Sequence, residues 1–368
     1  MVQILPAVWP ERTAFTLISG GKREITPRHL VSSRANRPYP ISMATLLELE
    51  KFIIELPAPS GWTRPVNEVS LRIEQGEALG LVGESGCGKT MLSLGLMGLE
   101  PHGARRSGRA WLGISRNGTD ARVNLAAFPP EGMRKLRGRE IAMIFQEPMT
   151  ALDPVMRIGA QIEEAIRAHE PALPSNEVRR RAIESLERAA VPEPAERARQ
   201  FPHQLSGGLR QRAMIAMALA MRPRLLIADE PTTALDVTVQ KQILELLLRL
   251  REELHLTLLF ITHDLGVVAQ IAQRVAVMYA GRIVEIGPTD EVLRAPRHPY
   301  TEGLLLAAPR LERGKLVPIL GSVPQLDALP PGCAFAPRCA YRRPECEVRV
   351  PELGSASPQH SARCILVP

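Results

Sequence analysis

Residues 46–287 consist of short apolar runs separated by polar or glycine-containing turns. Apolar runs of four to eight residues predict buried strands, and intervening stretches with helical periodicity predict an α/β fold with a largely parallel sheet. The expected elements are, in order, strands at 46–56, 69–73 and 77–83, a helix at 90–99, a strand at 224–229, a helix at 238–254, a strand at 257–262, a helix at 265–272, and strands at 274–281 and 282–287.

A long helical stretch interrupts this alternation. Residues 109–145 read as mixed strands and loops, whereas residues 157–221 are dominated by helical periodicity, with an Arg/Glu-rich face in EVRRRAIESLERAA. We therefore expect an α/β core into which a helical subdomain is inserted at about residues 147–222.

The two ends of the chain differ from this core. Residues 1–43 have no strand or helix periodicity and no apolar core of a signal peptide, so we expect a disordered extension, with Met43 as an alternative start of translation. From about residue 288, recurring prolines exclude regular elements over most of the sequence, and four of the five cysteines gather there. The predicted parts are an extension at 1–43, an α/β core at 44–287 and a loop-rich, Cys-containing C-terminal appendage at 288–368.

Composition narrows the class of protein. A chain of 368 residues with 45% hydrophobic residues has enough apolar content for about two domains. The longest apolar stretches, such as LTLLFI at 256–261, are far shorter than the roughly 18 residues that span a bilayer. The net charge of +7 comes from scattered arginines, and only 4% of residues are aromatic, which favours a solvated basic surface over binding of nucleic acid.

The sequence GESGCGKT matches the pattern GxxxxGK[ST] of a phosphate-binding loop, follows an expected strand and opens an expected helix. Backbone amides of such a loop wrap phosphates, and we expect Lys89 to pair with the β and γ oxygens and Thr90 to bind Mg²⁺. Cys87 is interpreted as an inert small residue. The expected ATP-binding residues of this loop are Gly83, Glu84, Ser85, Gly86, Cys87, Gly88, Lys89 and Thr90.

The strand RLLIADEP ends in two carboxylates. A strand buried on both faces would deliver Asp229 to the carboxyl edge of the sheet beside the phosphate loop, where it can hold Mg²⁺ through water. Glu230, one residue further, can polarise an attacking water. The pair of acids therefore predicts hydrolysis of the bound nucleotide.

The sequence LSGG, at 205–208, precedes DEP and follows the phosphate loop, and this order of motifs resembles the nucleotide-binding subunits of ABC transporters. The resemblance implies that Ser206, Gly207 and Gly208 contact the γ-phosphate of an ATP bound to a partner subunit, with two subunits enclosing two nucleotides head to tail. A site completed only when the subunits close makes hydrolysis conditional on closure.

Other positions match this family residue by residue. Gln146 in IFQEPMTALDP resembles the glutamine that senses Mg²⁺ and the attacking water, Asp236 in TTALD resembles the aspartate of the loop after DEP, and His263 in LLFITHDLG resembles the histidine that contacts the γ-phosphate. The family commonly stacks an aromatic ring on adenine. The aligned position here is Leu56, and the nearby candidates Phe52 and Trp62 leave the stacking residue open.

The sequences FQEPMTALDP, HPYTEGLLLAAPRL and GSVPQLDALPPGCAFAPRCAYRRPEC resemble the ATPase subunits of oligopeptide and dipeptide importers. This resemblance implies a short-peptide cargo and a peripheral position on the cytoplasmic face of the inner membrane. The implied partners are a second ATPase subunit, two transmembrane permeases and an extracytoplasmic solute-binding protein. Related importers carry nickel, glutathione or other solutes.

Two readings outside transport remain. A soluble ABC ATPase of DNA repair or translation would fit the basic balance, but such proteins usually contain two cassettes or large insertions, and this chain has one cassette. A metal-dependent redox regulator would use the cysteine segment as its sensor. A complete set of Lys89, Asp229, Glu230 and His263 favours turnover over sensing alone.

Four cysteines, Cys333, Cys339, Cys346 and Cys364, are spaced C-x5-C-x6-C-x17-C. Zinc knuckles usually pair cysteines only two to four residues apart, which this spacing does not supply. Four thiolates from a proline-stiffened, loop-rich segment can hold a [4Fe–4S] cluster, and the resemblance to the peptide-importer subunits points the same way. The alternatives are Zn²⁺ and free thiols.

Overall fold

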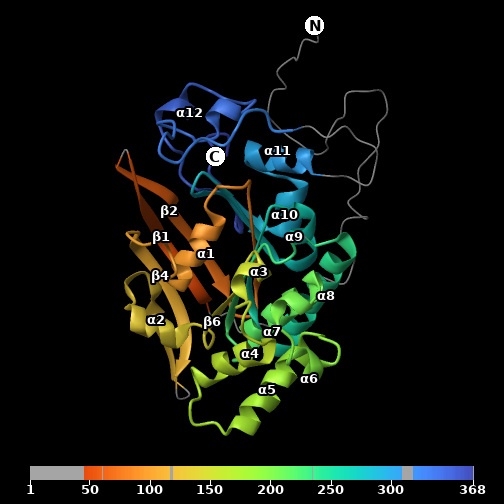
Figure 1. Cartoon of the computed structure of the whole chain (residues 1–368). Helices are drawn as coiled ribbons and strands as arrows, with labels where there is room; N and C mark the ends of the chain where they lie inside the picture. The colour runs from red at the N-terminus through yellow and green to blue at the C-terminus, as the bar shows by residue number, and fades with distance from the viewer. Residues whose placement is uncertain (1–44, 60, 117–118, 234, 309–317, 368) are drawn as a thin grey trace.

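The computed structural model describes residues 45–59, 61–116, 119–233, 235–308 and 318–367, which form two β-sheets with helices around them (Figure 1). The expected extension at 1–43 lies outside the described residues. The first sheet is antiparallel, with the order β2-β1-β4-β5. Its strands are β1 (Thr45–Ala58), β2 (Gly61–Glu74), β4 (Arg105–Arg116) and β5 (Thr119–Asn124).

The second sheet has eight strands, in the order β11-β12-β10-β9-β3-β8-β7-β6. The strands β6, β7, β8, β3 and β9 are parallel to one another. The bounds are β3 (Ala78–Val82), β6 (Ile141–Ile144), β7 (Leu225–Asp229), β8 (Thr257–Thr262), β9 (Arg274–Tyr279), β10 (Arg282–Pro288), β11 (Gly354–Ser357) and β12 (His360–Ala362). The prediction of an α/β fold with a mainly parallel sheet is confirmed for this central part.

The α-helices fall into two groups along the chain, those before β7 and those after it. The core and the interruption between β6 and β7 contain α1 (Lys89–Met97), α2 (Pro130–Leu136), α3 (Pro148–Ala151), α4 (Ile158–Arg167), α5 (Ser175–Arg188), α6 (Pro194–Arg197) and α7 (Gly207–Leu219). The later part contains α8 (Val237–Leu254), α9 (Leu265–Ile271), α10 (Thr289–Arg294), α11 (Pro299–Ala307) and α12 (Glu345–Val348). Short 3₁₀ turns are η2 (Leu125–Ala127), η3 (Pro202–Gln204) and η4 (Ala336–Arg338).

The central strands are buried on both faces because each alternate residue enters a different core. Leu225 and Ile227 of β7 join the apolar cluster around α1 and the antiparallel sheet, whereas Leu226 and Ala228 join the cluster that includes α7 and α8. A side-chain period of two explains this division. Near-continuous apolar sequence in these strands therefore reflects two-sided burial rather than helical structure.

The structure has two features that the sequence did not predict. The expected strands at 274–281 and 282–287 are present, and β9 and β10 form an antiparallel hairpin, because their connection by Ala280 and Gly281 is too short for a parallel crossover. The antiparallel sheet was also not foreseen as a separate sheet. Its strand β2 begins at Gly61, well before the apolar run at 69–73.

The C-terminal segment, residues 288–368, packs against the α/β core in its described part. Its strands β11 and β12 extend the large sheet through β10, with Glu285 opposite Ala362 and Ile286 opposite Ser361. A third apolar cluster joins this segment to β9 and α9. In Figure 1 the segment lies at the end of the molecule opposite α5.

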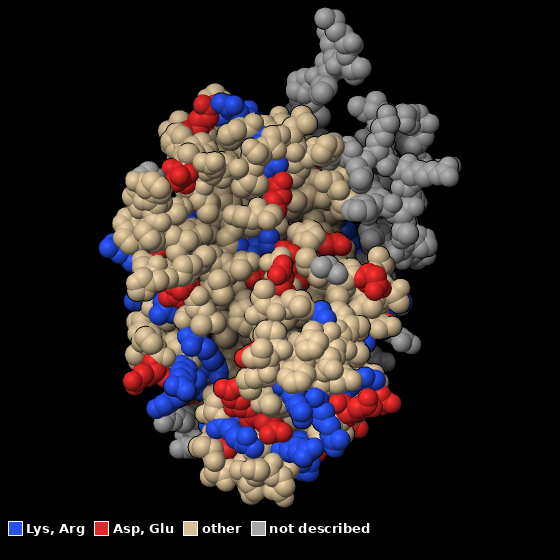
Figure 2. All heavy atoms as spheres, viewed as in Figure 1, with Lys and Arg blue, Asp and Glu red and all other residues tan. Residues whose placement is uncertain are grey.

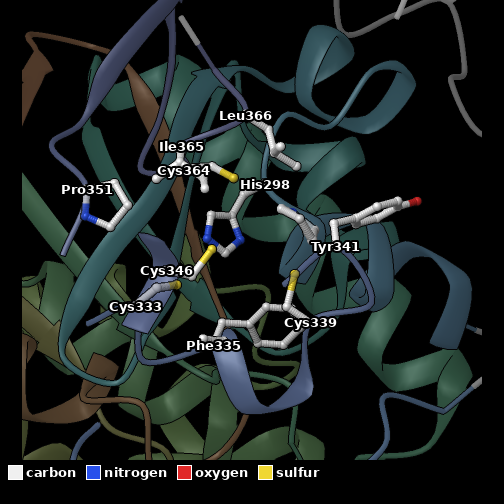
Figure 3. A pocket seen from close by; sticks show the side chains of 12 residues that line it. His298, Cys333, Phe335, Cys339, Tyr341, Cys346, Pro351, Cys364, Ile365 and Leu366 are labelled. Atoms are coloured by element: carbon white, nitrogen blue, oxygen red, sulfur yellow. The ribbon is translucent and has the colours of Figure 1, made fainter. Parts of the chain in front are cut away.

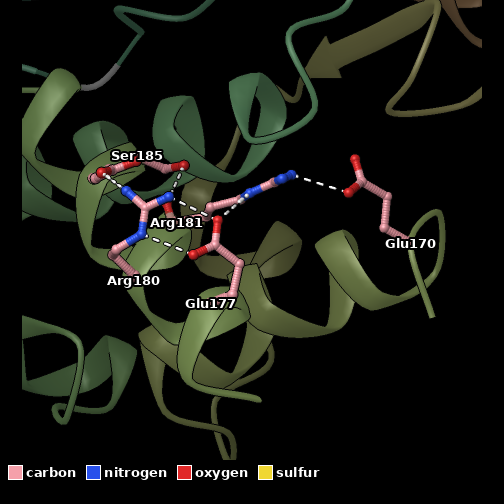
Figure 4. Close-up of polar contacts among 6 residues, drawn as sticks. Glu170, Glu177, Arg180, Arg181 and Ser185 are labelled. Carbon is pink, nitrogen blue, oxygen red and sulfur yellow. Dashed lines mark hydrogen bonds and ion pairs between the residues drawn. The ribbon is translucent and has the colours of Figure 1, made fainter. Parts of the chain in front are cut away.

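The Arg/Glu-rich face of the interruption is the solvent-exposed side of α5. Glu177 accepts hydrogen bonds from Arg180 and Arg181, and Arg181 also binds Glu170 (Figure 4). Acidic and basic side chains are intermixed on this end of the molecule (Figure 2). Exposed pairs of this kind contribute little to stability. None of the helices in the described ranges has the length and apolarity that a membrane crossing requires.

Candidate nucleotide site and cysteine cavity

The loop between β3 and α1 has the shape that the phosphate-loop motif predicts. Gly88 adopts a φ of 108°, and a Cβ there would lie 1.9 Å from the carbonyl oxygen of Pro65, so only glycine fits. At Gly83 a Cβ would lie 2.2 Å from the carbonyl oxygen of Met278. The Lys89 ammonium donates to the carbonyl oxygens of Gly83 (2.7 Å) and Glu84 (3.1 Å), which holds it inside the loop.

Cys87 is fully buried within this loop. Burial raises the pKa of its thiol, despite the opposing effect of Lys89. A protonated, enclosed thiol is a poor nucleophile, which agrees with the interpretation of Cys87 as a space-filling residue.

Asp229 lies at the end of β7, 1% exposed. Its Oδ2 accepts a hydrogen bond from the Ser93 hydroxyl at 3.3 Å, and its buried Oδ1 has no hydrogen-bond partner. Burial raises the pKa of Asp229, and hydrogen bonds from Thr90 and Ser93 oppose that effect. A buried carboxylate oxygen without a donor, beside a threonine hydroxyl, fits the oxygen ligands that Mg²⁺ prefers.

Two predicted residues, Gln146 and His263, converge on the carboxylate of a third, Glu230. Glu230 Oε2 accepts hydrogen bonds from Gln146 Nε2 at 3.3 Å and from the Thr233 hydroxyl at 2.8 Å, and His263 Nδ1 lies 3.4 Å from the same oxygen. Gln146, Glu230 and His263 follow the neighbouring strands β6, β7 and β8, so the parallel sheet brings their side chains to one edge. Glu230 has a φ of 45°, a strained conformation for glutamate that is typical of functional sites.

This constellation can position a water and accept its proton. The Glu230 side chain is 14% exposed and His263 is 63% exposed, so the group is open to solvent on the histidine side. Thr233 was not foreseen as a partner of Glu230. Its signal in the sequence was its place three residues after the glutamate, in the turn that follows β7.

Ser206 and Asp236 each begin a helix. The Ser206 hydroxyl accepts a hydrogen bond from the Leu209 N–H at the start of α7, and Asp236 Oδ1 accepts one from the Val239 N–H at the start of α8. Ser206, Gly207 and Asp236 are exposed, and Gly208 is half-buried against Val239. Over the part of the chain that the structure describes, no hydrogen bond joins residues 206–208 to residues 83–90.

The adenine candidates separate clearly. Phe52 is completely buried in the core against α1, which removes it from the candidates. Leu56 packs partly buried against the same core. Trp62 is 42% exposed, and the Arg105 guanidinium lies 3.8 Å from the centre of its ring. Trp62 remains the candidate with an accessible ring.

Two residues of the C-terminal segment that we did not predict contact the phosphate loop. Arg338 binds both carboxylate oxygens of Glu84, at 2.7 and 3.0 Å. The Glu84 N–H donates to the Tyr300 hydroxyl oxygen at 2.7 Å. Glu84 therefore has its side chain and its N–H occupied within the chain, and of the loop residues predicted to bind ATP it is the one turned toward the C-terminal segment. Sequence separations of 254 and 216 residues hid these contacts.

All four C-terminal cysteines line one cavity, together with His298, Phe335 and Tyr341 (Figure 3). All five cysteines lie in the described ranges, and none of them forms a disulfide. Burial raises the pKa of Cys333, and raises the pKa of Cys339 and of Cys364 to about 11. His298 is 2% exposed, and its Nδ1 accepts a hydrogen bond from the Tyr300 N–H at 3.1 Å.

The spacing of these side chains differs from that of a single-metal site. Within the described ranges, no group of three or more His, Cys, Asp or Glu side chains is close enough to hold one metal ion. Four thiols around a Zn²⁺ would each lie about 2.3 Å from it. The cysteines thus share a cavity without forming a compact tetrahedral site.

Known proteins resemble this chain at both the sequence and the structure level. Residues 66–233 match the ABC transporter family, and residues 284–346 match the family described as oligopeptide/dipeptide transporter, C-terminal region. A Brucella melitensis protein named for peptide import ATP binding is 53% identical over 310 residues, covering 82% of this chain and 90% of its own. A similarly named Brucella abortus protein is 45% identical over 326 residues, covering 88% and 96%.

Solved structures agree with the sequence matches. An ATP-binding cassette in a dimeric, post-hydrolysis state bound to ADP and Pi has a TM-score of 0.57 and 27% identity, covering 66% of this chain and 99% of its own. A subunit of an ABC transporter complex from Clostridium perfringens has a TM-score of 0.54 and 26% identity, covering 68% and 91%. The phosphate loop, the acids after β7 and the C-terminal match agree, and the chain belongs to the ATP-hydrolysing subunits of ABC importers of the oligopeptide/dipeptide type.

Proposed function

We propose that this chain hydrolyses ATP to power the import of short peptides through a membrane complex. The relatives named for peptide import and the C-terminal match support a peptide cargo. The proposed partners are a second ATPase subunit, two transmembrane permeases and an extracytoplasmic solute-binding protein. The chain would act as a peripheral subunit on the cytoplasmic face of the inner membrane.

In the proposed site, the amides of residues 83–90 surround the phosphates and Lys89 pairs with the β and γ oxygens. Thr90, Asp229 and Gln146 would hold Mg²⁺, which neutralises phosphate charge when bound. Glu230 accepts the proton of the attacking water, while Gln146 and His263 fix the position of its carboxylate. His263 would also contact the γ-phosphate.

The proposed hydrolytic site is completed by a second subunit. Ser206, Gly207 and Gly208 would bind the γ-phosphate held by the partner's loop, and Asp236 would lie beside that interface. The exposure of Ser206 and Gly207, away from hydrogen bonds to their own phosphate loop, supports this assignment. The helices α3–α7 would form a subdomain that faces the permeases, and residues 288–368 a C-terminal appendage on the ATPase core.

The single observation that carries this function is the convergence of Gln146, Thr233 and His263 on the Glu230 carboxylate, at the sheet edge beside Asp229. The test uses the whole importer reconstituted in vesicles with its binding protein. The variant Glu230→Gln should bind Mg²⁺·ATP normally and lose both hydrolysis and uptake of a labelled tripeptide. The matched control is Glu253→Gln, which changes an exposed glutamate of α8 and should leave both rates unchanged.

The possible outcomes test the role of Glu230 in hydrolysis separately from the identity of the transported solute. Retained turnover in the Glu230→Gln importer would remove Glu230 as the base. Uptake of nickel or glutathione in place of peptides, with hydrolysis still dependent on Glu230, would keep the ATPase assignment and replace the cargo.

The four cysteines of the C-terminal segment are proposed to hold a [4Fe–4S] cluster. They line one cavity whose other lining residues are mainly apolar, and four thiolates are the ligand set of such a cluster. Such a cluster supplies cross-linking of the irregular segment and, where solvent admits it, one-electron chemistry. Thiolates must form on binding, so assembly releases the protons that the raised pKa values hold on Cys333, Cys339 and Cys364.

An anaerobic preparation tests this assignment. About four irons and four sulfides per chain should be found, and Cys346→Ser should lose most of both. One zinc per chain without iron would establish the alternative metal, and metal-free protein with four alkylatable thiols would establish free thiols. Cys87→Ser is the control, because Cys87 lies in the phosphate loop and should leave the iron content unchanged.

A further inference from the structure

Glu84 is the point at which the C-terminal segment holds the phosphate loop. Its carboxylate is bound by Arg338, its N–H donates to Tyr300, and its carbonyl oxygen accepts a hydrogen bond from Lys89. Every polar group of this residue is therefore engaged, two of them by the C-terminal segment. The remaining contact fixes the lysine that the nucleotide needs.

Arg338 is rigidly held in its own place. Its side chain is 5% exposed, and its guanidinium also donates to the carbonyl oxygens of Leu320 and Ile319 and to the Tyr279 hydroxyl. A guanidinium with two parallel bonds to one carboxylate orients that carboxylate as well as attracting it. The pair therefore fixes the direction of the Glu84 side chain.

The position of Arg338 depends on the cysteine-bearing segment. Arg338 ends η4, between Cys333 and Cys339, and the turn is closed by bonds from the Ala336 N–H to the Cys333 carbonyl oxygen and from the Cys339 N–H to the Ala336 carbonyl oxygen. Disorder of this turn would remove the donor that faces Glu84.

ATP binding requires the phosphate loop to adopt one fixed conformation. Gly86 and Gly88 have positive φ values, and glycine-rich backbone loses much conformational freedom when it is fixed. Contacts that fix the loop beforehand lower this cost and strengthen binding. The bonds to Glu84 act within this loop, on the second of its residues.

We propose that Arg338 and Tyr300 are positioning residues for ATP, which hold the phosphate loop through Glu84, so that nucleotide binding and order of the cysteine-bearing turn stabilise each other. The inference rests on the proposed assignment of residues 83–90 as the nucleotide loop. The two effects are reciprocal by thermodynamic linkage, because ATP binding and ordering of the cysteine-bearing turn both favour the same arrangement of the phosphate loop.

The first test measures KM for ATP and kcat of the complete importer. Arg338→Met should raise KM roughly 5- to 20-fold, the loss expected for a charge-assisted hydrogen bond, with kcat changed less than about 2-fold. Arg338→Lys should recover part of the loss, because it keeps the charge without the paired bonds. The control is Arg342→Met, which removes an exposed pair with Glu347 in the same segment and should leave KM unchanged.

Coupling is tested by adding Glu84→Gln. The double variant should have the same KM for ATP as Arg338→Met alone, because both substitutions remove the same Arg338–Glu84 pair. Additive losses, or an unchanged KM in Arg338→Met, would overturn the positioning role.

A second measurement needs no variant. In the wild-type importer, hydrogen exchange at Ala336 and Cys339 should slow at least about 5-fold when a non-hydrolysable ATP analogue is added. Equal exchange rates with and without the analogue would contradict the inference, even if Arg338→Met fails to fold.

The variant Lys89→Ala separates a failure of the proposed nucleotide loop from a failure of the positioning role of Arg338. If this variant binds ATP normally, the nucleotide loop itself is wrongly assigned. If it loses ATP and Arg338→Met does not raise KM, only the positioning role fails.

Discussion

Gln146 Nε2 donates a hydrogen bond to Glu230 Oε2 across 3.3 Å, joining residues that are 84 positions apart in the chain. Gln146 follows β6 and is exposed, whereas Glu230 follows β7 and is mostly covered. The contact therefore links the start of the helical interruption to the carboxylate proposed as the base. Any movement of the loop after β6 changes the position of that carboxylate.

We predict that Gln146→Ala lowers kcat for ATP hydrolysis by about 10- to 100-fold, with a smaller change in KM. The loss is expected because a misplaced base costs far more in the transition state than in nucleotide binding. Steady-state hydrolysis by the importer measures both constants. Gln270→Ala is the matched control, because this exposed glutamine of α9 donates its side-chain hydrogen bond to the Gly266 carbonyl oxygen of its own helix. Equal effects of the two variants would show that the contact with Glu230 does not matter.

The Asp229 carboxylate gives a prediction about Mg²⁺ and pH. Asp229→Asn should raise the Mg²⁺ concentration needed for half-maximal hydrolysis by about 10-fold or more, since it removes a charged oxygen ligand. In the wild-type protein, only the ionised carboxylate binds the cation. Because burial raises the pKa of Asp229, Mg²⁺ affinity should weaken as the pH falls, and at a higher pH than for an exposed aspartate.

Titration of hydrolysis with Mg²⁺ at several pH values checks both statements. The Asn variant should need the higher Mg²⁺ concentration at every pH, with little pH dependence from this group. A requirement that is the same in both proteins would place the cation away from Asp229.

Much of this site was predictable from sequence because the motifs lie at strand ends. Strands such as 224–229 and 257–262 were recognisable by two-sided apolar burial, and parallel strands bring the residues after their carboxyl ends to a common edge. The positions of Glu230 and His263 were therefore predictable without coordinates. The strained φ of Glu230 was not, because backbone strain has no local sequence signature.

Contacts between distant segments could not be predicted in the same way. Nothing in the sequence near Arg338 indicates Glu84, since their pairing depends on how the C-terminal segment packs against β9 and α9. Phe52 failed as an adenine candidate for a related reason: alternation placed it on the core face of β1. The order of motifs thus predicts which residues meet at the carboxyl edge of a parallel sheet, but it does not predict contacts between segments that are far apart in the sequence.

Two glutamates, Glu48 and Glu177, are each bound by two arginines, and comparing them tests whether burial decides how much such pairs stabilise the fold. Glu48, on β1, is 8% exposed and binds Arg72 and Arg122 at 2.6 and 2.5 Å. These hydrogen bonds lower its pKa below the usual 4.5, those from Arg122 most strongly. We predict that Glu48→Gln lowers the free energy of unfolding by about 1–2 kcal/mol at pH 7.

The sign of the pH dependence is set by that lowered pKa. The stabilisation is present above the unfolded-state pKa near 4.5 and is lost as the pH falls through the folded-state value. The gap between wild type and Glu48→Gln in urea unfolding should therefore be constant near neutral pH and shrink below about pH 4.5. A gap that widens on acidification would contradict this assignment.

Glu177 on α5 is the exposed counterpart. Its pKa is lowered to about 2 by Arg180 and Arg181, yet water and salt screen these bonds. Glu177→Gln should leave the unfolding midpoint unchanged within error at neutral pH, both at low salt and in about 0.5 M salt. A loss equal to that of Glu48→Gln would show that burial does not decide the contribution of these pairs.

Trp62 gives the last prediction. Its ring is 42% exposed, and the strand that carries it leads to Pro65, whose carbonyl oxygen approaches Gly88 of the phosphate loop and Gly281. Arg105 covers one face of the ring at 3.8 Å, so adenine would stack on the other face or displace the guanidinium. Mg²⁺·ATP should quench tryptophan fluorescence, and Trp62→Leu should abolish that quenching and raise the Kd for ATP about 5- to 10-fold.

Trp111 is the matched control for this experiment. It lies on β4 with Arg122 at 5.7 Å from its ring, so it also has an arginine near its ring but is not on the strand that leads to Pro65. Trp111→Leu should therefore keep both the quenching and the affinity. If Trp62→Leu also keeps both, adenine does not stack on this ring, and its cation–π pair with Arg105 is then a structural contact that fixes the β1–β2 hairpin against β4. If quenching is lost but affinity is not, the ring reports the nucleotide without contributing to its binding.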